Sequence, residues 1–344
     1  MKKFFLKLGL ALLPIVAYVA FFIAFEPNNY FGLHTGANAD DSVIAKIRSF
    51  EQDGATRIIL GDSRMAHFDA DAVQAAAGAP FANLAFGGAS LEESIDLFYF
   101  AFAQNPKLEQ VVFGFTFYTL NTNYGSVNRM ATIQTQLQNP LAYIFNLEYN
   151  INTLQNFVYK VQGVQTGGAD ETAVWGPADY LDSTTGSALP YRANLIRYAA
   201  SLYGNCAQPG TLDGAQTETQ LAAAMLATNA SASKFTVNEE QLNRLLEMAA
   251  LCEREGIYLS IVLPPISESV RELVCEPLGI DLAMAPALAA LHSIQSEYVQ
   301  VLDYEWENPP AFEDAQFFDG FHIDTVYGLP AFTEMLFNEV ANGA

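Results

Sequence analysis

The sequence predicts a three-layer α/β fold, in which a five-stranded parallel sheet has helices on both faces. Apolar segments typical of buried strands alternate five times with segments of helical periodicity. Parallel strands need long crossover connections, so this alternation favours right-handed β-α-β units and a flavodoxin-like strand order. A separate apolar run near the N-terminus predicts a membrane-spanning helix outside this fold.

The composition is that of a folded protein and excludes one class of partner. The chain has 344 residues, of which 51% are hydrophobic, enough for a packed core. Its net charge is −22, which repels phosphate backbones, so nucleic-acid binding is not expected. Cys206, Cys252 and Cys275 lack the spacing of a metal site. The sequence leaves two alternatives open for these cysteines. They form one disulfide of unknown pairing, or all three are free thiols.

The N-terminus predicts the compartment. Lysines at positions 2, 3 and 7 precede an uncharged run over residues 8–25. A helix of this length rises roughly 27 Å, close to the hydrocarbon thickness of a bilayer. The positive flank predicts a cytoplasmic N-terminus and an extracytoplasmic body, periplasmic or on the cell surface. The nearest Ala-x-Ala lies well beyond the run, at residues 37–39. An uncleaved signal anchor over residues 1–27 is therefore favoured over a cleaved signal peptide or a buried core helix.

The first elements after the anchor follow from short patterns. Residues 28–54 are expected to form a linker and a leading helix, the helix over residues 42–50. The first strand, residues 58–60, is continuously apolar, as expected of a fully buried strand. Asp69 is the expected start of a helix over residues 70–77, and Gly78 is its expected end.

Later elements complete the alternation. A second strand within residues 81–86 and a third strand over 111–117 are separated by a helix over residues 91–102. Residues 121–235 are expected to form a mostly helical insertion that covers the substrate site. The first part of this insertion is rich in Asn, Gln and Tyr, which suits a sugar-binding surface or an ordinary helical cap.

The C-terminal third supplies the last two strands. Thr236 and Glu239 predict a capping box for a helix that Gly256 ends, and the fourth strand follows over residues 257–263. Further predicted elements are helices over residues 267–278 and 283–296, a fifth strand over 299–303 and a closing helix over 331–340.

The turn after the first strand is the candidate active site. The strand ends in Gly61, Asp62 and Ser63, and glycine allows the backbone to turn sharply there. Open α/β sheets build their sites just past the carboxyl ends of central strands. Near the C-terminus, Asp319 precedes His322 by three residues. This spacing lets a carboxylate hold the imidazole while its other ring nitrogen faces a serine hydroxyl.

Together these motifs resemble the SGNH, or GDSL, hydrolase superfamily over roughly residues 55–340. Gly-Asp-Ser near the start and Asp-x-x-His near the end have the order of that family. The segment over residues 61–69, Gly-Asp-Ser-Arg-Met-Ala-His-Phe-Asp, is similar to a membrane-tethered subset. That subset includes the D-alanyl transfer proteins of lipoteichoic acid and partners of membrane-bound O-acyltransferases. The resemblance implies an SGNH hydrolase fold over residues 55–344.

The resemblance also implies a catalytic role for each matching residue. Ser63 is the expected nucleophile, His322 the general base and Asp319 the group that orients the imidazolium. The backbone N–H groups of Ser63 and Gly88 are expected to hold the oxyanion. The third family donor, an asparagine in a Gly-x-Asn-Asp block, is replaced by Thr116 here. A threonine hydroxyl has a shorter reach, so this donor is the weakest assignment.

Four neighbouring polar residues are expected to contact substrate. Asp62 and Arg64 flank the serine, and Asn121 and Asn123 follow the third strand, where they could replace the missing oxyanion donor. No metal site is expected, because the candidate ligands around His322 lack a second histidine cluster. No cofactor is expected either, and phosphate chemistry is disfavoured because no Walker-type loop or basic cluster occurs.

The implied reaction is acyl transfer through a serine acyl-enzyme. The expected enzyme is an extracytoplasmic esterase or O-acyltransferase for small acyl esters, acetyl or D-alanyl in type. Its expected substrate is a cell-envelope polysaccharide or teichoic-acid-like polymer, and a membrane-bound O-acyltransferase is the expected partner by resemblance. The alternative is a non-catalytic polymer-binding or assembly subunit, favoured by the missing asparagine. A lipase for long acyl chains would need an apolar groove, of which residues 121–160 show little sign.

Overall fold

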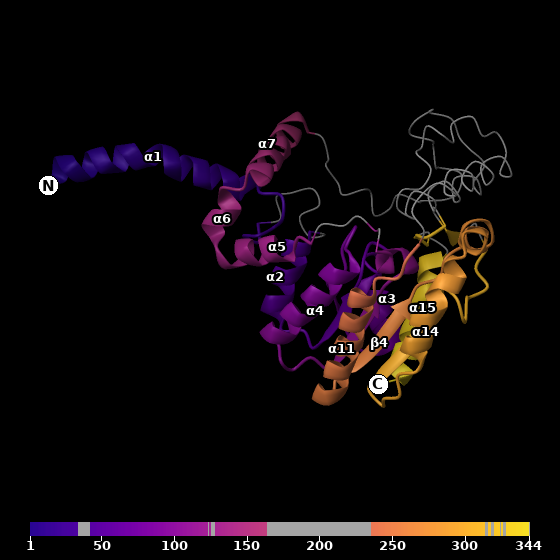
Figure 1. Cartoon of the computed structure of the whole chain (residues 1–344). Helices are drawn as coiled ribbons and strands as arrows, with labels where there is room; N and C mark the ends of the chain where they lie inside the picture. The colour runs from indigo at the N-terminus through magenta and orange to yellow at the C-terminus, as the bar shows by residue number, and fades with distance from the viewer. Residues whose placement is uncertain are drawn as a thin grey trace, which may run out of the picture. The chain divides into compact units, whose positions relative to one another are not determined.

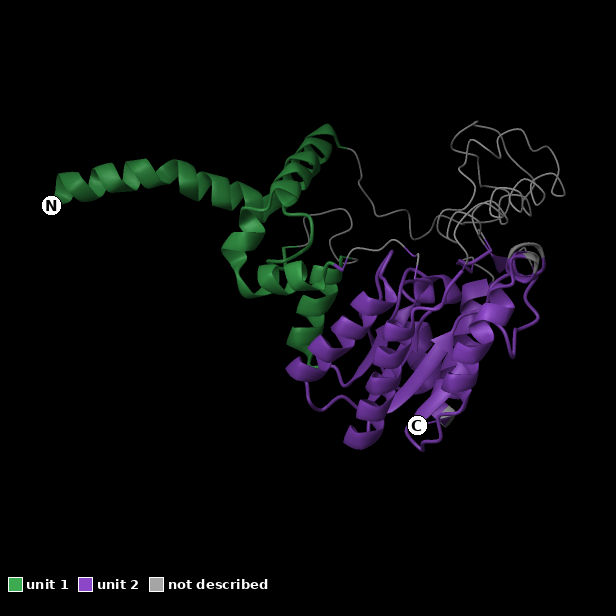
Figure 2. Cartoon of the chain, viewed as in Figure 1, with its two compact units in different colours: residues 1–54, 129–173 green, residues 55–128, 174–344 purple. Residues whose placement is uncertain are grey.

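The chain contains an α/β part built on a parallel sheet and a part that is helical (Figure 1). The computed structural model describes residues 1–33, 42–122, 124, 128–163, 235–313, 316–317, 320–323, 325 and 328–343. The chain divides into two compact units. The first contains residues 1–54 and 129–173, and the second contains residues 55–128 and 174–344 (Figure 2). The second unit contains the whole sheet. Residues 129–173 of the expected insertion therefore group with the N-terminal residues.

The sheet has five parallel strands in the order β2-β1-β3-β4-β5. They are β1 (Arg57–Leu60), β2 (Ala82–Asn83), β3 (Gln110–Gly114), β4 (Tyr258–Leu263) and β5 (Val299–Asp303). In β1, Ile59 pairs with Asn83 on one side and with Val112 on the other. The predicted α/β class, the five parallel strands and the flavodoxin-like order are confirmed. The order reverses between β1 and β3, which is where open α/β sheets bind ligands.

Helices cover both faces of the sheet (Figure 1). Those of this unit are α3 (Ala70–Ala77), α4 (Leu91–Gln104), the 3₁₀ helix η1 (Phe117–Leu120), α11 (Glu239–Glu255), α12 (Glu268–Val270), the π-helical η2 (Arg271–Cys275), α13 (Glu276–Leu278), α14 (Ile280–His292) and α15 (Gly328–Asn342). The helices α3 and α15 pack against each other. Phe332, Leu336 and Phe337 of α15 form one buried cluster with Ile59 and Val112 of the strands. This apolar layer fixes the sheet beneath the candidate site.

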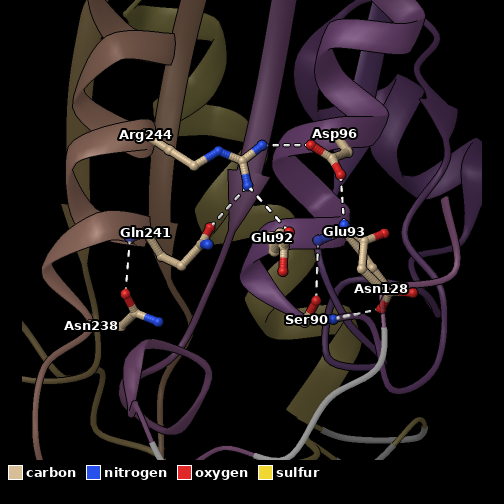
Figure 3. Close-up of polar contacts among 8 residues, drawn as sticks. All are labelled: Ser90, Glu92, Glu93, Asp96, Asn128, Asn238, Gln241 and Arg244. Carbon is tan, nitrogen blue, oxygen red and sulfur yellow. Dashed lines mark hydrogen bonds and ion pairs between the residues drawn. The ribbon is translucent and has the colours of Figure 1, made fainter. Parts of the chain in front are cut away.

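Polar contacts join α11 to α4 (Figure 3). The guanidinium of Arg244 lies 2.5 Å from Asp96 and 3.8 Å from Glu92, both on α4. Asn128 also donates to Asp96, over 2.7 Å. Ser90 begins α4 with a capping box, in which its hydroxyl accepts from the Glu93 N–H. These contacts fix α4, which follows β2, against α11, which precedes β4.

Most elements match the expected boundaries, and three differ for local reasons. The second strand ends at Asn83, whose side chain accepts from the Ala85 N–H over 3.0 Å, although the Leu84 and Phe86 N–H groups still donate to the Ile59 and Gly61 carbonyls. The third strand ends at Gly114, and a 3₁₀ helix begins at Phe117. The expected Thr236 cap is wrong. Asn238 caps α11 instead, since its side chain accepts from the Gln241 N–H over 3.2 Å.

The regular elements of the first unit are all helices within the part that the structure describes. Its helices are α1 (Lys2–Phe25), α2 (Val43–Asp53), α5 (Met130–Gln138), α6 (Pro140–Ile144) and α7 (Leu147–Gln162). Among the described residues, α1 alone is long and apolar enough to cross a membrane, with a mean hydropathy of 2.5. The expected N-terminal apolar helix is thereby confirmed. The helical prediction for residues 121–235 is supported by α5 to α7, and residues 164–234 lie outside the described chain.

The described cysteines are thiols. Cys252 and Cys275 are both free and buried, and Cys206 lies outside the described residues. Burial raises the pKa of Cys252 to about 12 and the pKa of Cys275 well above its ordinary value. Both therefore act as small apolar core side chains rather than as nucleophiles.

Candidate active site

The turn after β1 is shaped by Gly61. Its φ of 141° is a conformation that side chains rarely adopt. A Cβ at this position would lie 2.8 Å from the carbonyl oxygen of Gly114 and 2.7 Å from Met65 Cγ. The Met65 N–H donates to the Asp62 carbonyl over 3.0 Å and closes the turn. This close approach between β1 and β3 leaves Ser63 at the carboxyl edge of the sheet.

Ser63 and His322 meet at this edge. The Ser63 Oγ lies 2.7 Å from the His322 Nε2, although the two residues are 259 positions apart in the chain. Both side chains are partly exposed, so a substrate can reach them. This is the distance required of a nucleophile and its general base. Asp319 lies outside the described residues, and its pairing with His322 stays a prediction.

Asp62 is directed into the protein instead of toward solvent. It is buried, and its Oδ1 accepts from the Arg64 N–H over 3.0 Å. Its Oδ2 accepts from the Tyr118 hydroxyl over 2.7 Å. Burial, and then the charge of Asp62, raises the pKa of Tyr118 well above its ordinary value, so the phenol remains a donor. Asp62 thus fixes the turn, and its surroundings give no support to substrate contact.

Arg64 is also buried and connects the serine turn to the histidine loop. It donates through Nη2 to the Pro265 carbonyl, and its guanidinium lies 5.8 Å from the ring centroid of Phe321. Phe321 precedes His322, and its ring also lies 5.3 Å from that of Tyr118. Next to it, the Gly320 carbonyl accepts from the Ser267 N–H over 2.9 Å. Arg64 and Phe321 therefore hold His322 opposite Ser63, and direct substrate contact by Arg64 stays untested.

The remaining oxyanion assignments stay predictions. Gly88 is exposed and has a left-handed φ of 67°, as a glycine loop permits. Thr116 is fully buried, and its carbonyl accepts from Thr119 in η1. Asn121 is buried too, and its side chain accepts from the Thr236 N–H over 3.4 Å. Asn123 lies outside the described residues.

Asn83 is a site residue that the sequence analysis missed. Its Nδ2 donates to the carbonyls of Met65 and Ala66, over 2.9 and 3.3 Å. The adjoining chain follows β1, since the Phe86 N–H donates to the Gly61 carbonyl over 3.2 Å. Asn83 therefore fastens the glycine loop after β2 to the serine turn. The sequence signal that could have identified Asn83 is an amide side chain at the carboxyl end of a short strand.

Glu305, two residues after β5, is the second missed residue. It is fully buried, and its Oε1 accepts from the Phe117 N–H over 3.3 Å. Burial raises the pKa of Glu305 to about 8, although the positive charge of Arg64 favours its ionised form. The negative charges of Asp303 and Asp62 act in the same direction as burial. A cluster of buried charged groups thus lies behind the serine turn.

Glu305 predicts a pH dependence of stability. Its pKa is raised in the folded chain, from an ordinary value of 4.5 to about 8. Between these values the unfolded chain has lost the proton that the folded chain still holds. The stabilisation is complete below about pH 4.5 and is lost by about pH 8, with a slope of up to about 1.4 kcal/mol per pH unit. Denaturant unfolding of the full chain should show this slope.

The substitution Glu305→Gln should flatten that slope, because the amide keeps the shape without a titrating proton. Glu313→Gln removes one exposed carboxylate and is the matched control, for which the slope should persist. An unchanged slope in Glu305→Gln would show that another group is responsible.

His292 has acidic partners that its sequence spacing does not reveal. Its Nε2 lies 3.3 Å from both Asp303 Oδ2 and Glu307 Oε2. These three side chains offer metal-ligand atoms within 4.8 Å of one another, in a chain for which no metal site was expected. Asp303 Oδ1 accepts from the N–H groups of Glu305 and Trp306, which gives the carboxylate a role in the turn after β5.

Comparison with known proteins adds no family assignment. No protein-family model matches the chain, and no curated protein matches it. The resemblance to SGNH hydrolases therefore rests on the sequence motifs alone.

Proposed function

We propose that this chain is a membrane-anchored serine esterase or O-acyltransferase for small acyl esters, acetyl or D-alanyl in type. Its substrate would be a cell-envelope polysaccharide or teichoic-acid-like polymer. The main support is the 2.7 Å distance between Ser63 Oγ and His322 Nε2. A second support is their position beside β1 and β3, where the strand order reverses.

The proposed mechanism is a two-step acyl transfer. Ser63 Oγ attacks the acyl carbonyl carbon while His322 Nε2 accepts the hydroxyl proton. The N–H groups of Ser63 and Gly88 hold the oxyanion that forms. The imidazolium then protonates the departing alcohol, and the acyl group stays on Ser63. His322 next deprotonates water, or a sugar hydroxyl, which attacks the acyl-enzyme and regenerates Ser63.

The proposed location is outside the cytoplasm, with α1 as the anchor. The length and apolarity of α1 support anchoring, and the lysines at positions 2, 3 and 7 favour a cytoplasmic N-terminus. The proposed polymer substrates occur on that outer side. By resemblance, a membrane-bound O-acyltransferase would be the partner that supplies or accepts the acyl group.

A fluorophosphonate probe tests the proposal, because it phosphonylates only serines whose hydroxyl is activated. The full chain in detergent should form one adduct, which peptide mass spectrometry locates at Ser63. Ser63→Ala should form none, and His322→Gln should react at least about a hundredfold more slowly. Ser49→Ala, which alters an exposed serine of α2, is the matched control and should react like the parent chain.

An unlabelled parent chain would contradict the enzymatic proposal. It would favour the non-catalytic polymer-binding or assembly subunit instead. The observation that favours this alternative is Thr116, which replaces the family asparagine and is fully buried.

A further inference from the structure

The outward face of α7 is apolar. Leu147, Ile151, Leu154, Val158 and Val161 recur every three or four residues and therefore lie along one side of the helix. Their exposed fractions lie between 38% and 76%. We call these five residues the α7 stripe. Leu141 and Phe145, which precede α7, are also largely exposed.

The inward face of α7 combines polar side chains with the ring of Phe157, whereas the aliphatic side chains face outward, which reverses the usual pattern of a helix in water. Asn156 donates to the carbonyl of Phe25, the last residue of α1, over 3.1 Å. Asn150 accepts from the Tyr18 hydroxyl over 2.7 Å. Thr153 is buried, and its hydroxyl donates to the Tyr149 carbonyl. The helix thus satisfies its polar groups inside the unit and leaves its aliphatic side chains uncovered within the described residues.

The partner of this polar face is the C-terminal part of α1 (Figure 1). The Phe157 ring lies 5.3 Å from that of Phe21 and 5.2 Å from that of Phe25. Tyr18 stacks on Phe145 with ring centroids 5.9 Å apart. The uncharged run of α1, residues 8–25, rises about 27 Å, close to the thickness of a bilayer core. The contacts with α7 lie along the last eight residues of this run, in the leaflet where α1 leaves the membrane.

The end of α1 is fixed to the rest of the unit. Glu26, which follows α1, is fully buried and accepts from the Tyr143 hydroxyl over 2.5 Å. Burial, and then the charge of Glu26, raises the pKa of Tyr143 above its ordinary range. Tyr143 also stacks on Tyr30, with ring centroids 4.2 Å apart. These contacts hold α6, the helix that precedes α7, against the end of α1.

We propose that the α7 stripe is a lipid-binding surface, buried at the boundary between headgroups and acyl chains in the leaflet where α1 leaves the membrane. The inference rests on the proposed anchoring by α1 and is independent of catalysis. Lipid covers a continuous aliphatic surface that adjoins a membrane-spanning helix. The charges of α7 are Glu148 and Lys160, which cancel, so binding requires no anionic lipid.

Fluorescence quenching by brominated lipid tests this surface. The full chain is reconstituted in phosphatidylcholine with acyl chains that are brominated or unmodified. The parent chain has two tryptophans, and their emission is subtracted. The added fluorescence of Leu154→Trp should fall to about half or less in brominated lipid, because the side chain reaches the acyl region. Gln155→Trp, at the next exposed position, is the matched control and should be quenched much less.

Leu13→Trp, within α1, reports on the anchor itself. Strong quenching at position 13 without quenching at position 154 would contradict the lipid-binding surface. The same result would support membrane anchoring by α1. That result would mean that a protein surface covers the stripe. Equal quenching at positions 154 and 155 would also overturn it, because the stripe would then have no preferred orientation. An absence of quenching at position 13 would contradict both the membrane anchoring by α1 and the lipid-binding surface.

Discussion

Ser63→Ala is expected to lower hydrolysis of p-nitrophenyl acetate by the full chain by at least about 10³-fold. Alanine removes the proposed acyl acceptor, the Ser63 Oγ, while the turn around it keeps its backbone bonds. His322→Gln should cause a loss of similar size, because the Ser63 hydroxyl would then keep its proton. Initial rates with purified chains, compared at equal folded concentration, measure both losses.

The double variant gives the sharper result. In the proposed mechanism Ser63 and His322, 2.7 Å apart, act as one unit, so the combined loss should be close to that of either single variant. Multiplicative losses would show that the two residues act independently. Ser49→Ala should retain the parent rate. Activity that survives in Ser63→Ala would assign hydrolysis to another group and contradict the proposed nucleophile.

The sheet was predictable because its signals are local. Continuous apolar runs mark the buried strands, and glycines such as Gly78 and Gly256 end helices in the left-handed conformation. The Ser63 and His322 pair was predictable for another reason, since both lie in motifs of fixed spacing. The end of β2 at Asn83 was not predictable, because the Asn83 side chain bonds the Ala85 N–H and the serine turn through contacts that depend on the folded loop.

The surroundings of the site depend on long-range contacts, which spacing does not encode. Asp62 and Arg64 look like substrate contacts beside a serine, yet the turn directs both into the protein. Their partners, Tyr118 and Pro265, come from distant segments. Glu305 likewise meets Phe117 only once β5 lies in place.

The first part of the insertion shows a similar limit. Its Asn, Gln and Tyr content suggested a sugar-binding or capping surface. In α7 the amides Asn150 and Asn156 instead face α1, and the aliphatic residues between them face outward. Composition alone does not distinguish the two faces of a helix, whereas its periodicity does.

Gly61→Ala is expected to lower the free energy of unfolding by about 3 kcal/mol or more. The methyl group would lie 2.8 Å from the backbone oxygen of Gly114, and a backbone atom between two paired strands has no room to move. The φ of 141° adds strain that only glycine avoids. Denaturant unfolding of the full chain in detergent measures the loss.

Gly87→Ala is the matched control, because no atom lies within 4 Å of its added Cβ. Equal stability of the two variants would show that β1 and β3 can separate at Gly61 without cost. The same contact also positions Ser63, so Gly61→Ala should lose fluorophosphonate labelling even at temperatures where it stays folded. Stability and reactivity therefore depend on one close approach between two strands, and the requirement for glycine at position 61 is structural and chemical at once.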